Sequence, residues 1–272
     1  MARPHPFFHA DRPLVFAHRG GAALAPENTL AAFDRGVALG ADGIELDLHR
    51  SRDGHLVACH DPTVDRTTDG RGRIADLDLA ELQTLDAGYR FTPDDGRTFP
   101  FRGQDVRIPT FEEILLRYPD TRFSIELKLG DLVSARQALA TAESAGVVGR
   151  TCLGAFNQKP VSWLRSRRRG VATWATRPEV VRFLALDALR LSRVRAPRAH
   201  AFCIPEHSGR SRIVTPRRIR ALARHGTPVH VWTVDDQADM RRLLAWGVTG
   251  LVTDRPDLAV AAVSERAPGS GP

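Results

Sequence analysis

Short apolar runs alternate with longer amphipathic segments along most of the chain, and this alternation constrains the fold more than any other feature. Alternation of strands with helices is typical of βαβ units in a mostly parallel sheet. The predicted strands are residues 14–17, 44–48, 56–59, 123–127, 151–156, 171–175, 199–204, 229–234 and 250–253. The predicted helices are residues 29–39, 111–117, 132–144, 161–167, 178–191, 216–224 and 238–245, with Asn28, Thr110 and Thr215 among the expected N-caps.

One pair of strands cannot be parallel. Residues 44–48 and 56–59 are joined by a short polar link that contains Asp53-Gly54, whereas a parallel connection needs about a dozen residues or more. Asp-Gly favours a two-residue hairpin turn. We therefore expect an antiparallel hairpin whose register places His60 opposite Asp47. The other eight strands match a (β/α)8 TIM barrel, which typically has about 250 residues.

The predicted domain organisation is a single TIM-barrel domain over residues 12–262, followed by a flexible tail at 263–272. Residues 62–109 are polar and rich in turn residues, and they are too long for an ordinary loop. We expect them to form a small insertion after the second barrel strand and its hairpin. The insertion holds four closely spaced aromatic residues, Tyr89, Phe91, Phe99 and Phe101.

The composition is that of a globular protein, but the charge is uneven. Hydrophobic residues make up 42% and charged residues 26% of the 272 positions, which excludes wholesale disorder. Residues 1–136 hold 17 basic and 22 acidic residues, and residues 137–272 hold 22 and 10, so the net charge of +7 comes from the second half. Such a balance suggests a phosphorylated ligand, an anionic membrane or nucleic acid, with a coding bias toward arginine as the alternative.

Cysteine usage and hydropathy bear on location. The three cysteines have no CxxC spacing, and no apolar run approaches the roughly 18 residues of a membrane span. The first ten residues lack the apolar centre of a signal peptide. We therefore expect a cytoplasmic protein.

Charged side chains share one face of two predicted strands. Glu45 and Asp47 alternate with aliphatic residues, as do Glu126 and Lys128, so the charged groups are expected to point into the barrel mouth. Unpaired buried carboxylates are costly. One divalent cation would neutralise all three, and oxygen ligands favour Ca²⁺ or Mg²⁺. A network of salt bridges with Lys128 and arginines is the alternative.

Two histidines and an arginine are expected at the same mouth. His18 and Arg19 end the first strand, and His60 follows the hairpin. Histidine supplies acid–base chemistry near neutral pH, and arginine binds phosphate oxygens in pairs. Together with the carboxylates, this set suits phosphodiester cleavage. The structural alternatives are a histidine with no catalytic part and a plain strand-to-loop corner.

The motifs that hold these residues resemble those of the glycerophosphodiester phosphodiesterases, a family of phosphatidylinositol-phospholipase-C-like barrels. The resemblance covers most of residues 14–258, and the order and spacing of its first four blocks are specific. The blocks are AHRGGAALAPENTLAAF (17–33), GADGIELDLHRSRDGHLVACHDPTVDRTTDGRG (40–72), IPTFEEIL (108–115), FSIELK (123–128), VHVWTV (229–234) and GLVTDRPD (250–257).

The resemblance implies roles for individual residues. His18 and His60 would be the general acid and base. One divalent cation, Ca²⁺ or Mg²⁺, would be bound by Glu45, Asp47 and Glu126. Substrate and phosphate would be bound by Arg19, Lys128, Glu27 and Trp232. Glu27 could instead stabilise the first turn of the next helix, and Trp232 could be a core aromatic. The chain has Asp235 where the family often has Asn, and Ala155 where it often has Ser, which leaves substrate preference open.

The predicted function is metal-dependent hydrolysis of glycerophosphodiesters to sn-glycerol 3-phosphate and an alcohol. One alternative is a lysophospholipase D, in which the aromatic-rich insertion admits the lipid tail of a lysophospholipid. A different class is a non-catalytic protein that binds phosphate or an anionic surface through its arginine-rich half. No nucleic-acid partner is expected, and a peripheral contact with an anionic membrane fits the charge of the second half.

Overall fold

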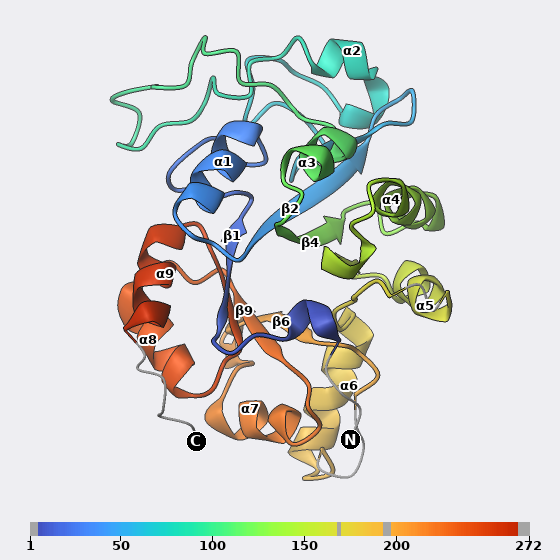
Figure 1. Cartoon of the computed structure of the whole chain (residues 1–272), viewed down its shortest axis with the longest axis vertical. Helices are drawn as coiled ribbons and strands as arrows, with labels where there is room; N and C mark the ends of the chain where they lie inside the picture. Colours follow the sequence, from blue (N-terminus) through green and yellow to red (C-terminus); the bar gives the residue numbers. More distant parts are fainter. Residues whose placement is uncertain (1–4, 168–169, 193–196, 266–272) are drawn as a thin grey trace.

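The predicted parallel strands form one curled sheet (Figure 1). The computed structural model describes residues 5–167, 170–192 and 197–265. Its main sheet has the order β5-β4-β2-β1-β10-β9-β6. These strands are β1 (Leu14–His18), β2 (Gly43–Arg50), β4 (Arg122–Leu127), β5 (Thr151–Gly154), β6 (Phe202–Pro205), β9 (Val229–Trp232) and β10 (Gly250–Thr253).

The ring closes between β5 and β6 through the predicted strand at residues 171–175. Ala172 forms a parallel bridge to Cys152, and Trp174 forms one to Ala201. Backbone hydrogen bonds from Leu153 N to Ala172 O (2.9 Å) and from Ala175 N to Ala201 O (2.8 Å) hold this segment on both sides. The (β/α)8 barrel is therefore confirmed, although the fifth strand position is held by single bridges rather than a ladder.

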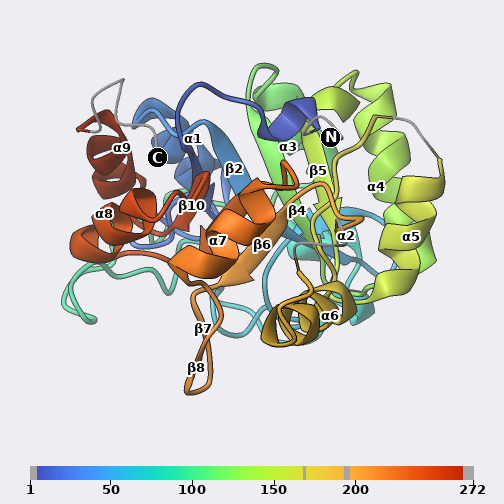
Figure 2. The ribbon, with the colours of Figure 1, turned by 90° about the horizontal axis from the view of Figure 1, so that it is seen from below.

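Helices surround the ring (Figures 1 and 2). They are α1 (Leu30–Ala38), α3 (Phe111–Arg117), α4 (Leu132–Ser144), α5 (Gln158–Ser166), α6 (Arg177–Ala188), α7 (Pro216–Ala223), α8 (Gln237–Ala245) and α9 (Pro256–Ser264). The bounds of α3 and α4 are those predicted, whereas α9 was not predicted. The N-cap of α1 is Thr29, whose hydroxyl accepts from Ala32 N, and not Asn28. None of the described helices is both long and apolar enough to cross a membrane.

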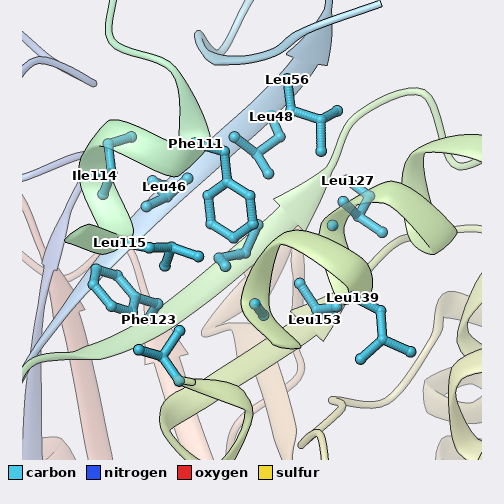
Figure 3. Close-up of a cluster of buried hydrophobic side chains, with 14 of the residues drawn as sticks. Leu46, Leu48, Leu56, Phe111, Ile114, Leu115, Phe123, Leu127, Leu139 and Leu153 are labelled. Carbon is cyan, nitrogen blue, oxygen red and sulfur yellow. The ribbon is translucent and has the colours of Figure 1, made fainter. Parts of the chain in front are cut away.

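The outer face of the sheet packs against the helices (Figure 3). Leu46 and Leu48 of β2 are buried with Phe111 of α3 and Leu139 of α4. Because side chains alternate along a strand, Glu45 and Asp47 lie on the inner face. The predicted division of aliphatic and charged faces is confirmed.

The barrel extends beyond the predicted domain bounds at both ends. The 3-10 helix η1 (Pro6–Phe8) packs at the start of the strands, where the ring of Phe7 stacks on Phe16 and that of Phe8 meets His230 edge-on. Residues before the expected bound at residue 12 thus pack on the barrel. Val263, one residue past the expected bound at 262, is buried within α9. The rest of the predicted tail, from residue 266, lies outside the described residues.

The hairpin is antiparallel as predicted, but its register is not. β3 (Leu56–Ala58) pairs with β2 so that Leu48 faces Ala58, one position away from the expected pairing. The turn is closed by a hydrogen bond from Ser51 N to His55 O, and Gly54 has φ of 94°. A three-residue loop with a left-handed glycine is a common hairpin form, and it replaces the expected two-residue turn. Cys59, rather than His60, lies opposite Asp47.

The segment between β3 and α3 has a small core of its own. It contains the 3-10 helix η2 (Ile74–Asp76) and α2 (Leu79–Leu82), and its buried residues include Val64, Ile74 and Leu82. Its aromatic rings contact one another and Arg102. Two further elements are η3 (Val148–Arg150), before β5, and a hairpin of β7 (His207–Ser208) and β8 (Ser211–Arg212). The hairpin projects from the body of the molecule (Figure 2).

Candidate active site

A cavity of about 430 Å³ opens at the carboxyl ends of the barrel strands, and its two halves differ. The polar half comes from β1, β2, β4 and the segment after β3, and it contains His18, Arg19, Glu45, Asp47, His60, Glu126 and Lys128. The apolar half includes Phe156, Trp174, Val180, Val181, Leu184, Ile204 and Trp232. All the predicted site residues except Glu27 line this cavity.

His18, the last residue of β1, is held by a carboxylate from the other end of the chain. Its Nδ1 lies 2.6 Å from Asp254 Oδ1, and its Nε2 lies 3.8 Å from Glu45 Oε2. Burial alone would lower the pKa of His18, but the hydrogen bond to Asp254 and the two negative charges outweigh it and raise the pKa above its usual value. Asp235 accepts a hydrogen bond from Asp254 N (2.7 Å) and so supports this pair.

His60 has the same kind of partner. Its Nδ1 lies 2.7 Å from Asp61 Oδ1, and the other carboxylate oxygen of Asp61 accepts from Arg66 Nε at 2.6 Å. The hydrogen bond from Arg66 lowers the pKa of Asp61 to about 2. The predicted pairing of His60 with Asp47 was wrong, yet both line the cavity because the chain continues past β3 along its rim.

The three predicted metal ligands come from adjacent strands, where Asp47 and Glu126 are register partners. Burial and the charge of Asp47 raise the pKa of Glu45 to about 8, and burial raises the pKa of Glu126 as well. Lys128 Nζ lies 2.9 Å from Asp47 and 3.1 Å from Glu126. These two ion pairs are the ones expected if salt bridges with Lys128, rather than a divalent cation, neutralise the carboxylates. Among the described residues, no three His, Cys, Asp or Glu side chains already converge on a metal position.

Arg19 connects several of these groups. It has left-handed backbone geometry (φ 51°), and its backbone N donates to Glu45 at 3.3 Å. Its Nη1 donates to Glu27 at 2.9 Å, and its Nε lies 3.3 Å from Asp47 without a hydrogen bond in the described structure. Glu27 therefore belongs to the site through Arg19, rather than by lining the cavity.

Sequence reasoning missed four residues that hold the predicted ones: Asn28, Asp61, Arg66 and Asp254. The Asn28 amide is buried and donates to Asp47 Oδ2 at 3.1 Å, while its carbonyl accepts from Asp47 N. The adjacency of Asp61 to His60 was a usable signal. For Asp254 the sequence signal was weaker: it directly follows the last barrel strand, at the end of the barrel where active-site residues gather.

A closed (β/α)8 barrel with two carboxylate-held histidines, cations and acidic groups at its mouth has the features of a barrel hydrolase. The sequence model of the "Glycerophosphoryl diester phosphodiesterase family" matches residues 18–258. A "Glycerophosphodiester phosphodiesterase" of Caldanaerobacter subterraneus subsp. tengcongensis is 33% identical over 258 residues, which cover 92% of this chain and 97% of the relative. The chain belongs to the glycerophosphoryl diester phosphodiesterase family, and it is an enzyme of that family.

Solved structures agree. The crystal structure of a glycerophosphodiester phosphodiesterase from Agrobacterium tumefaciens is 31% identical, with a TM-score of 0.72, over 92% of this chain and 99% of that one. An Oleispira antarctica phosphodiesterase, solved in complex with the product sn-glycerol-3-phosphate, has the same fold, with a TM-score of 0.71 and 24% identity. That likeness covers 93% of this chain and 97% of the other.

Proposed function

We propose that the chain hydrolyses glycerophosphodiesters to sn-glycerol 3-phosphate and an alcohol, with a bound divalent cation. The observation that carries this proposal is the pair of imidazoles, each with Nδ1 on a carboxylate, that face one cavity beside Arg19 and Lys128. The product bound to the Oleispira relative supports the choice of substrate class.

The histidines move the protons. A carboxylate only accepts hydrogen bonds, so Asp254 and Asp61 keep a hydrogen on Nδ1 of His18 and His60. Nε2 of each ring is then the atom that exchanges a proton. In the first step one ring takes the proton of the neighbouring glycerol hydroxyl as its oxygen attacks phosphorus, and the other ring gives a proton to the leaving alcohol oxygen. Water then opens the cyclic phosphate with the two roles exchanged, which leaves sn-glycerol 3-phosphate.

The cations bind the phosphate. Arg19 and Lys128 both line the cavity, and Arg19 Nε has no hydrogen-bond partner in the described structure. A guanidinium donates well to phosphate oxygens and stabilises charge that develops on them. Glu27 holds the other end of the guanidinium and so fixes its direction.

A divalent cation fits the acidic groups by their chemistry. Glu45, Asp47 and Glu126 would hold it, since they offer only oxygen donors, which suit Ca²⁺ and Mg²⁺ alike. Burial, with a further contribution from the charge of Asp47, raises the pKa values of Glu45 and Glu126, and for Glu126 the charge of Lys128 offsets this only in part. When bound, the ion would polarise the phosphoryl group.

The test is hydrolysis of glycerophosphocholine by wild type, Glu45→Ala, Glu126→Ala and His60→Ala, with and without EDTA. Loss of an acid–base group costs about 10²–10⁴-fold in rate, so we expect at least a hundredfold loss in His60→Ala. We also expect loss of activity in EDTA. His55→Ala is the matched control, because His55 is exposed in the hairpin turn. Full activity in EDTA or in His60→Ala would contradict the mechanism.

The apolar half of the cavity favours a second candidate, a lysophospholipase D. Phe156 and Val181 are more than half exposed at its rim, next to Val180 and Leu184. The aromatic residues of the insertion do not line the cavity. We therefore propose that a lipid tail would contact these rim residues instead. We expect Val181→Asp to reduce kcat/KM for lysophosphatidylcholine and to leave that for glycerophosphocholine unchanged. An equal effect on both substrates counts against the lipid.

Contact with an anionic membrane is proposed on the same exposed rim residues and on the excess of basic residues in 137–272. Co-sedimentation with phosphatidylglycerol vesicles, compared with phosphatidylcholine vesicles, tests it. Salt-sensitive binding to the anionic vesicles without turnover of any diester would instead favour the non-catalytic binding protein. The cytoplasmic location and the lack of a nucleic-acid partner stay predictions.

A further inference from the structure

One residue of the insertion reaches the site. Arg66 Nη1 and Nη2 donate to the two carboxylate oxygens of Glu27 at 2.7 and 2.8 Å, and Arg66 Nε donates to Asp61 at 2.6 Å. The side chain of Arg66 is 49% exposed, whereas that of Glu27 is 15% exposed. The guanidinium thus covers a largely buried carboxylate from the solvent side.

Each carboxylate that Arg66 contacts leads to a different site residue. Asp61 holds Nδ1 of His60, and Glu27 holds Nη1 of Arg19. A guanidinium is planar, and its donors have a fixed geometry, so one side chain sets the directions of both carboxylates. A proton-transfer group and a phosphate-binding group are therefore joined through one residue outside the barrel.

The backbone around Arg66 is well held. Val64 and Thr68 are fully buried on either side of it, and the Thr68 hydroxyl donates to Val64 O at 2.9 Å. Val64 N donates in turn to Gly72 O at 3.0 Å. These contacts fix the backbone position of Arg66, which its long side chain needs if it is to orient its two partners.

We propose that Arg66 is a positioning residue that orients His60 through Asp61 and Arg19 through Glu27. The inference rests on the proposed function of that site. Without the guanidinium, Asp61 could rotate away from His60, and Glu27 would interact with Arg19 alone and compete with the phosphate for it. The insertion would thereby contribute to turnover without touching the substrate.

The electrostatics agree with this geometry. Burial would raise the pKa of Glu27, but its hydrogen bonds and ion pairs with Arg66 and Arg19 outweigh burial and lower it. The pKa of Asp61 is lowered to about 2, chiefly by its hydrogen bond from Arg66. Both partners therefore keep their negative charge, and their bonds to Arg66, at every pH near neutrality.

The experiment measures kcat and KM for glycerophosphocholine in Arg66→Gln, Asp61→Asn, Glu27→Gln and the double variant Arg66→Gln/Asp61→Asn. We expect Asp61→Asn to lower kcat about tenfold or more and Glu27→Gln mainly to raise KM. Arg66→Gln should do both. If Arg66 acts through Asp61, the double variant should have a kcat within about twofold of the lower single variant, because coupled residues are not additive.

Arg71→Gln is the matched control, since Arg71 is exposed in the same insertion and has no side-chain partner in the described structure. It should have wild-type kcat and KM.

Arg66→Lys should also lower kcat and raise KM, but by less than Arg66→Gln. A lysine ammonium keeps the positive charge but cannot bond both carboxylates in the way that the planar guanidinium does.

If the wild-type enzyme hydrolyses glycerophosphocholine, the proposed function is supported, and two outcomes would then overturn the inference about Arg66 alone. One is wild-type kcat and KM in folded Arg66→Gln or Arg66→Lys. The other is a double variant whose loss equals the product of the single losses. Absence of wild-type turnover on every glycerophosphodiester would instead contradict the proposed function.

Discussion

His18 Nδ1 and the Asp254 carboxylate lie 2.6 Å apart, although 236 positions separate the two residues in the sequence. β1 and β10 are hydrogen-bonded neighbours, with Ala17 paired to Thr253, so the residues that follow each pair meet at the rim. Closure of the barrel therefore builds this contact, and a histidine at one end of the chain acquires its partner only when the last strand is in place.

Replacing Asp254 tests that contact. In Asp254→Asn, the amide can donate to Nδ1 and favour the wrong tautomer, so we expect kcat to fall by about 10–100-fold with a smaller change in KM. Steady-state hydrolysis of glycerophosphocholine measures both constants. Asp257→Asn is the control, because Asp257 pairs with Arg255 nearby. An unchanged kcat in Asp254→Asn would show that His18 does not need this partner.

Adding the cation should stabilise the protein. An ion that binds only the folded state at about 100 times its Kd adds about 2.7 kcal/mol, so CaCl₂ or MgCl₂ should raise Tm. The rise should be lost in Glu126→Gln and kept in Glu112→Gln, which changes an exposed residue of α3. Differential scanning fluorimetry measures it. An equal rise in both variants would place the ion elsewhere.

His230 should make the fold sensitive to acid. Its ring is buried beside Phe8 and Phe16, and burial lowers its pKa to about 4. Between about pH 6.5 and 4, the unfolded chain binds a proton that the folded chain excludes, so acid favours unfolding there. The full effect is roughly 3 kcal/mol, absent above pH 6.5 and growing as the pH falls.

Urea unfolding of wild type and His230→Leu at pH 7 and pH 4.5 isolates this contribution. The intrinsic cost of the substitution cancels when each protein is compared with itself. His200, whose pKa burial also lowers to about 4, is present in both proteins. We expect wild type to lose more stability than the variant on acidification. Equal losses would mean that His230 is protonated in the folded state.

Gly154 should tolerate no side chain. A Cβ at this position would overlap the indole of Trp174, which lines the cavity. Overpacking costs about 1–3 kcal/mol, and the displaced ring would also reshape the apolar half, so Gly154→Ala should lower unfolding free energy and alter KM. Gly149→Ala is the control, because open space surrounds that position. Wild-type stability and KM in Gly154→Ala would contradict this packing.

Local patterns predicted much of the fold. The α3 and α4 bounds follow from caps and hydrophobic spacing, which act within a few residues. The hairpin register failed because Asp53-Gly54 is compatible with both two- and three-residue loops, and only the left-handed Gly54 decides between them. α9 was missed although Pro256 marks its first turn.

The site was predictable as far as single strands define it. Alternation placed Glu45, Asp47 and Glu126 on the inner face, but it carries no information about partners from distant segments. Only tertiary structure brings Asp254 to His18 and Arg66 to Glu27. Asn28 misled for a related reason: its residue type suits a cap, and only the fold shows its amide on Asp47.

Backbone pairing is uneven around the barrel, because residues 171–175 are held by two single bridges while β2 and β4 form a continuous ladder. Every residue of β2 from Gly43 to Leu48 is paired with β4, and this ladder carries Glu45, Asp47 and Glu126. Helix α6, which carries Val180, Val181 and Leu184 of the cavity, begins directly after the segment held by single bridges. Fewer backbone hydrogen bonds would therefore have to break for the apolar wall to shift around a bulkier alcohol than for the charged groups on β2 and β4 to move.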